Sequence, residues 1–154
     1  MGRMYTVQVR GVAVSTVQDI IAAYSGALRQ IKVHALQLGA SGQTTVANLG
    51  ITLKHLAATV TQGSGGNAPT PTRVNPLDAG ASFTARVNDT TQATSSGIVF
   101  VFCDEFNPIN GFYWQAPVRG HEPEATINEA LVLSLDNTPS VTLTMNATLW
   151  VEEL

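Results

Sequence analysis

The chain has 154 residues, 12% of them charged, and a formal net charge of −3. That length suits one domain, so residues 1–154 are expected to share a single core. The lack of a basic excess argues against nucleic-acid binding, and no stretch has the length of a membrane span or the form of a signal peptide, which indicates a protein made in a cytoplasm.

The first predicted element is a strand near the N-terminus. Apolar and polar residues alternate from Tyr5 to Val9, which is the period of a strand with one face buried. The phase slips by one residue at Gly11 and then continues to Val14. This slip predicts a β-bulge at the glycine.

Residues 15–24 are compatible with two structures. Ser15 and Gln18 match a capping box, and the apolar residues that follow could share one face of a two-turn helix. A connection of this length between two strands could equally contain a short strand. The capping pattern favours one short helix near residues 16–24.

The middle of the chain contains several further predicted strands, at Leu28–Leu38, Leu49–Thr61, Phe83–Val87, Phe112–Trp114 and Leu131–Leu135. Another run, Ile98–Phe102, is apolar at every position and is therefore expected to be covered on both faces. Cys103 continues this run and is expected to be a buried, inert side chain.

The Gly- and Pro-rich segment from Gly63 to Gly80 is the longest irregular stretch in the chain. Loops of this length in compact domains are usually functional or mobile. We expect it to act as an arm that reaches a neighbouring subunit or a larger assembly. Its candidate contact residues are Gly63, Pro69 and Pro71.

The C-terminal segment has the clearest pattern in the sequence. From Val141 to Glu152 every odd position is apolar, and every even position except Trp150 is polar. This alternation predicts a long strand with one face on the core. Trp150 would lie on the polar face, which makes it a candidate aromatic anchor between subunits.

Together these segments predict an all-β fold of about eight strands, an antiparallel β-sandwich or barrel. Ordinary soluble domains carry roughly 25% charged residues, twice the share found in this chain. A surface rich in threonine and poor in charge is weakly protected against association. We therefore expect copies of the chain or a partner to cover much of it.

Residues able to support catalysis are sparse. The histidines His34, His55 and His121 lack the short spacing of a metal site. Asp104 and Glu105 are adjacent, so in a strand they would point to opposite faces and could not act as a pair. The sequence therefore predicts a protein that is not an enzyme and has no metal or cofactor.

A cluster of aromatic residues includes Tyr113 and Trp114. Consecutive residues of a strand face opposite sides, so one of these two side chains must leave the core. Packing at the core or strand edge would explain the cluster, and so would a contact surface. Tyr113, Trp114 and Trp150 are therefore the aromatic interface candidates.

Seven segments, spaced nearly from end to end, carry a family resemblance: Met4-Tyr5-Thr6-Val7, Gly11-Val12-Ala13-Val14, Gln18-Asp19, His34-Ala35-Leu36-Gln37-Leu38-Gly39, Gly63–Pro71, Asn88-Asp89-Thr90-Thr91 and Ala147–Glu153. In these segments the chain resembles small structural proteins of tailed bacteriophages and prophages. The resemblance implies a virion component, most plausibly a capsid decoration (cement) protein with a jelly-roll-like sandwich fold. It transfers no functional residues.

These features and the resemblance leave three candidate functions. The first is a decoration protein that forms a homo-oligomer, expected to be a trimer, and docks on the phage major capsid protein after synthesis in the bacterial cytoplasm. The second is a carbohydrate- or receptor-binding β-sandwich of a head or tail fibre, with Tyr113, Trp114, Asp104 and Glu105 at its site. The third, an enzyme, is disfavoured because the histidine spacing of cupin-type metal enzymes is absent.

Overall fold

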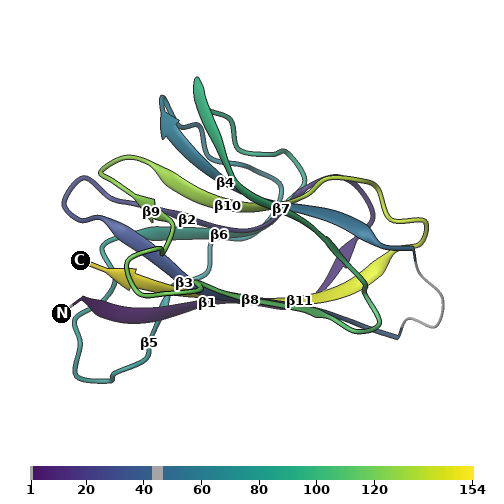
Figure 1. Ribbon diagram of the computed structural model, residues 1–154, viewed down its shortest axis with the longest axis horizontal. Coiled ribbons are helices and arrows are strands. Elements are labelled where there is room, and N and C mark those ends of the chain that lie inside the picture. Colours follow the sequence, from purple (N-terminus) through teal and green to yellow (C-terminus); the bar gives the residue numbers. More distant parts are fainter. Residues whose placement is uncertain (1, 43–46) are drawn as a thin grey trace.

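The structure is a computed structural model that describes residues 2–42 and 47–154. It contains two antiparallel sheets packed face to face, which confirms the predicted β-sandwich. Figure 1 shows the two layers, with both chain termini at the same end of the molecule. No helix in the described ranges is long and apolar enough to cross a membrane.

Sheet A has the strand order β5-β1-β11-β3-β8, and β9 pairs with the start of β3. Its strands are β1 (Arg3–Val14), β3 (Ile31–Ser41), β5 (Thr72–Arg73), β8 (Phe112–Gln115), β9 (Glu124–Ala125) and β11 (Leu143–Glu153). Sheet B has the order β6-β2-β10-β4-β7. Its strands are β2 (Asp19–Tyr24), β4 (Leu49–Ala58), β6 (Thr84–Asp89), β7 (Gly97–Phe106) and β10 (Ala130–Leu135). The described residues form eleven strands, where the sequence predicted about eight. The difference arises chiefly because β5 and β9 have two residues each, too few to show an alternating pattern.

The core lies between the sheets, and the alternation in β1 and β11 sets its boundary. These two strands pair from Arg3↔Glu153 to Val14↔Leu143, with the register shift that was predicted around Gly11. Gly11 has a φ of 64°, a conformation that glycine adopts without steric cost. The odd residues of β11 are buried, which confirms the predicted alternation from Leu143 onward. Val141, where the predicted strand began, lies before β11 and is exposed.

The predicted helix near residues 16–24 is wrong, because the chain forms β2 there. All six residues of β2 are buried, because one face of the strand packs on the core between the sheets and the other belongs to a second apolar cluster. In that cluster Ala22 and Tyr24 are covered by the segments that contain Val60 and Ala93. Gln18 does not close a capping box; its side-chain amide donates to Asn88 Oδ1 at 2.6 Å. A strand that is buried on both faces shows no alternation of apolar and polar residues. Its sequence therefore cannot be distinguished by pattern from a short apolar helix.

Two sheet edges are covered by the chain's own segments. In sheet A, β5 covers the beginning of β1 by pairing with Tyr5 and Thr6. In sheet B, the segment from Thr61 to Asn67 forms bridges to Val87 of β6 and to Thr91 and Thr94 beyond it. Covered edges of this kind prevent unwanted pairing with other chains.

Candidate functional site

The edge strand β7 differs from the covered edges. Within the described residues its one pairing partner is β4, and its other side carries no paired strand. Four consecutive apolar side chains of β7 are exposed: Ile98 (46%), Val99 (54%), Phe100 (64%) and Val101 (37%). Figure 1 shows the start of β7 and the end of β4 rising together away from the rest of sheet B.

The expectation that Ile98–Phe102 is covered on both faces is therefore wrong. Cys103, which was expected to be buried, is exposed in the same strand. A continuous apolar run has no period, so it cannot distinguish a central strand from an open edge. Val101 is the extra residue of a β-bulge, because Phe102 pairs with Leu53 and Phe100 with Lys54. Elsewhere in β7 successive residues point to opposite faces, so the exposed side chains present apolar surface on both sides of the strand.

The predicted aromatic candidates lie in different environments. Tyr113 is 59% exposed, whereas Trp114 turns inward and stacks on Phe102 with ring centroids 5.1 Å apart. One member of the pair leaves the core, as predicted. Because Trp114 packs inside, the two rings cannot form one aromatic surface, and the site proposed for Tyr113 and Trp114 with Asp104 and Glu105 is not assembled.

Trp150 lies half-exposed on the outer face of sheet A, opposite the face of β11 that packs on the core. It is paired with Thr6 of β1 on one side and with Ala35 of β3 on the other. Gln115 of β8 is paired with Ala35 and continues this row across the sheet. The two cross-strand partners of Trp150, Thr6 and Ala35, are therefore small and uncharged.

A β-bulge brings His34 to the same face. The register between β11 and β3 shifts between Trp150↔Ala35 and Val151↔Val33, which leaves His34 as the extra residue. Leu36 is again buried, so both His34 and Ala35 lie between two inward-facing residues. Bulges often re-aim side chains in this way beside functional sites.

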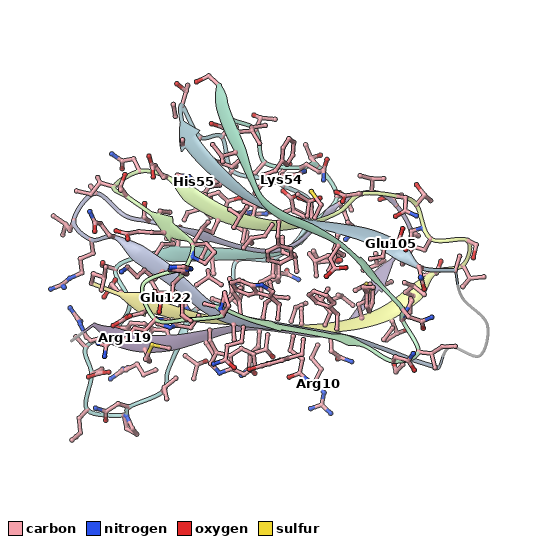
Figure 2. The ribbon with its side chains drawn as sticks, in the orientation of Figure 1. Arg10, Lys54, His55, Glu105, Arg119 and Glu122 are labelled. Atoms are coloured by element: carbon pink, nitrogen blue, oxygen red, sulfur yellow. The ribbon has the colours of Figure 1, made fainter. Side chains whose placement is uncertain are left out.

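His34 lies between two carboxylates. Its Nε2 is 2.8 Å from Glu152 Oε2, and its Nδ1 is 3.8 Å from Glu122 Oε1. The pKa of the Glu122 carboxyl lies below its ordinary value, chiefly because the carboxylate accepts a hydrogen bond from its own backbone N–H. A bond from the Gly120 N–H and the nearby His34 and Lys32 lower this pKa further, and burial opposes them without reversing the shift. Figure 2 shows Glu122 and Arg119 at the end of the sandwich that carries the termini.

Tyr113, Trp150 and His34 border a depression of about 390 Å³, which we name the aromatic hollow. It is lined by Met4, His34, Ala35, Tyr113, Gln115 and Trp150. A second depression of about 370 Å³ shares Met4, His34 and Gln115 with it and extends to Glu122 and Glu152. Sequence reasoning identified Tyr113 and Trp150 but missed His34 as their neighbour. The available signal was the phase slip from Ala35 to Leu36, which indicates a bulge.

The remaining candidates, Gly63, Pro69 and Pro71, do not form one free arm. Gly63 is buried, and its backbone N–H donates to the Tyr24 hydroxyl at 3.3 Å. Burial raises the pKa of Tyr24 to about 12. Pro69 and Pro71 are half-buried in the connection that leads to β5. The part of the Gly63–Gly80 segment that could still act as a contact arm therefore begins after Asn67. Leu77 in this part is 92% exposed.

No group of three or more His, Cys, Asp and Glu side chains that could hold a metal ion occurs in the part of the chain that the structure describes. Comparison of the chain with protein families, curated proteins and solved structures found no match.

Proposed function

We propose that this protein is a structural component of a bacteriophage virion, a capsid decoration protein that associates with copies of itself on the shell. The observation that carries this proposal is the open, apolar edge of β7. Four consecutive apolar side chains, from Ile98 to Val101, are exposed there, and contiguous exposed apolar surface is often functional. Such an edge in a soluble chain needs a partner.

The occupant that fits the edge is a second β7. Gly97 to Cys103 contains no charged residue, so two antiparallel copies can pair there without repulsion. Asp104 and Glu105 lie near one end of β7, so antiparallel pairing centred on Phe100 keeps the acidic residues of the two copies apart. Two sheets B would then join into one continuous sheet across a two-fold axis.

The strand order supports a virion role. Sheet A contains the row β1-β11-β3-β8, and sheet B contains the row β2-β10-β4-β7. We interpret these two four-stranded rows as a jelly roll, an arrangement common in viral capsid proteins and also found in lectins and cupins. The low charge and the resemblance to phage structural proteins point the same way.

The native mass of the purified protein tests the association. We expect a dimer or a multiple of it, and we expect Phe100→Asp to be monomeric because burying an unpaired carboxylate at the joint is costly. Val141→Asp, at an apolar position that is 48% exposed in the connection between β10 and β11, is the matched control and should keep the wild-type mass. Circular dichroism checks that both variants fold.

Two outcomes would contradict this account. A wild-type monomer at every concentration, or a Phe100→Asp protein with unchanged mass, would show that β7 does not join copies. A native mass of three chains, the number expected from the sequence, would require a head-to-tail contact and would overturn the two-fold pairing.

Shell binding tests the virion role separately. Phage shells prepared without this protein should bind the wild type in a sedimentation assay and bind Phe100→Asp more weakly, because joined copies gain avidity. Failure of the self-associated wild type to sediment with any shell would contradict the decoration role, while leaving the β7 contact intact.

A further inference from the structure

The outer face of sheet A carries a second feature, which does not depend on self-association. Beside the aromatic hollow lies a depression of about 300 Å³, which we name the glycine hollow, lined by Gln37, Leu38, Gly39, Asn146, Ala147 and Thr148. Both hollows are bounded by β3 and β11. Together they follow the length of these strands.

Gly39 keeps the glycine hollow open. It is an ordinary strand residue, paired with Asn146, and no atom lies within 4 Å of the position that its Cβ would occupy. Neither a positive φ nor close packing therefore requires glycine here. A glycine inside a strand without such a cause marks a place where a ligand or another backbone can approach closely.

The polar groups of this face are neutral along most of its length. Thr148 and Gln37 form one row with Tyr113, and Thr6 forms the next with Trp150 and Gln115. Amide and hydroxyl groups both donate and accept hydrogen bonds, as a ligand covered with hydroxyl groups requires.

Charged groups lie mainly around the end of the face that carries the termini. There Glu152 and Glu122 contact His34, and Arg119 lines the same depression. Figure 2 shows Glu122 and Arg119 at this end, and Arg10 projecting from the same layer. Carboxylates close to the cations disfavour a phosphate or nucleic-acid ligand, which would need a basic surface.

We propose that the outer face of sheet A binds an extended saccharide chain, with Trp150 and Tyr113 as the surfaces on which sugar rings stack. Aromatic side chains that are apolar on their faces and lie beside polar groups suit a sugar ring, which is apolar on its C–H face and polar at its rim. The open hollows suit a chain that lies along β3 and β11. His34, held by Glu152, and Gln115 lie within the aromatic hollow as hydrogen-bonding groups.

A glycan array carrying pyranose oligosaccharides from bacterial surface polysaccharides tests this proposal, followed by titration of the strongest hit. The wild type should bind a defined subset, and Trp150→Ala should lower the affinity at least tenfold. Gly39→Val should do the same by filling the glycine hollow. Its melting temperature should equal or exceed the wild-type value, because a β-branched residue suits a strand better than glycine.

The matched control is Phe100→Ala, which removes an exposed aromatic ring from β7. It should keep full glycan binding even if it changes the native mass, so the glycan site and the proposed function can fail independently. An array without signal above background, or unchanged affinity in Trp150→Ala and Gly39→Val, would overturn the saccharide site. If Trp150→Ala had a lower native mass than the wild type, the outer face of sheet A would be a contact between copies. That result would also overturn the saccharide site.

Discussion

Glu129 illustrates how single polar residues hold the loops to the sandwich. Its Oε2 accepts hydrogen bonds from the backbone N–H of Thr126 at 2.7 Å and from His55 Nε2 at 2.8 Å. It thus joins the loop before β10 to β4, where Figure 2 labels His55. Burial acts to raise the pKa of Glu129, but the bonds from Thr126 and His55 together outweigh it, so the pKa lies below the ordinary 4.5.

This pKa shift predicts a pH dependence of stability. A lowered carboxyl pKa in the folded state stabilises the fold above the ordinary value, and the contribution disappears as the pH falls through the lowered one. Wild type should exceed Glu129→Gln in unfolding free energy by about 0.5–1 kcal/mol at neutral pH, a small difference because the pair is partly solvated. Urea titrations should show that the difference in unfolding free energy between the wild type and Glu129→Gln decreases as the pH falls below 4.5. A gap independent of pH would contradict this role of the Glu129 charge.

Individual residues also show where sequence reasoning stops. The positions of Trp150 and Tyr113 outside the core followed from alternation within their strands, and both were found there. Their meeting with His34 and the open space at Gly39 depends on which strands are neighbours. Pairing between β3 and β11 joins residues more than a hundred positions apart, and alternation within a single strand carries no information on such pairing.

Among the elements, strands with one buried face were the ones that could be predicted. β1 and β11 alternate because one side meets the core and the other meets solvent. β2 and β7 are both largely apolar, yet β2 is buried at every residue and β7 is mostly exposed. β2 lies between two strands and has an apolar cluster on each face, whereas β7 is an edge strand with exposed side chains. This difference belongs to the tertiary structure.

The loop segment around Gly63 and Gly66 is part of the fold, because it covers the β6 edge. The Gly66 N–H donates to Asp89 Oδ1 at 3.0 Å, and a Cβ on Gly66 would lie 2.0 Å from the carbonyl oxygen of Val87. An arm that could be deleted without effect on the monomer would make no such contacts. This segment protects its edge, in contrast to β7.

Substitution of two glycines separates the covering segment from the exposed part of the loop. Gly66→Ala should destabilise the protein by about 1–3 kcal/mol, because the added methyl group would overlap backbone atoms that cannot move aside freely. Gly80→Ala, where no atom lies within 4 Å of the new Cβ, should change the stability little. Thermal unfolding measures both effects. Equal stability of the two variants would contradict the covering role of the segment at Gly66.

At the scale of the whole molecule, the sandwich is asymmetric in its edges. The segment from Thr61 to Asn67 covers β6, and β5 covers the beginning of β1 at Tyr5 and Thr6. The long edge of β7 is left with exposed apolar side chains and no second strand in the described residues. This open apolar edge is the reason why we propose that the protein associates with copies of itself.

Hydrogen exchange of the β7 amides, measured at several protein concentrations, tests the central claim most directly. If two β7 strands pair, amides on the side of β7 that faces away from β4 should exchange slowly at high concentration. They should exchange quickly after dilution and in Phe100→Asp. Fast exchange of these amides in the wild type at every concentration would contradict pairing through β7.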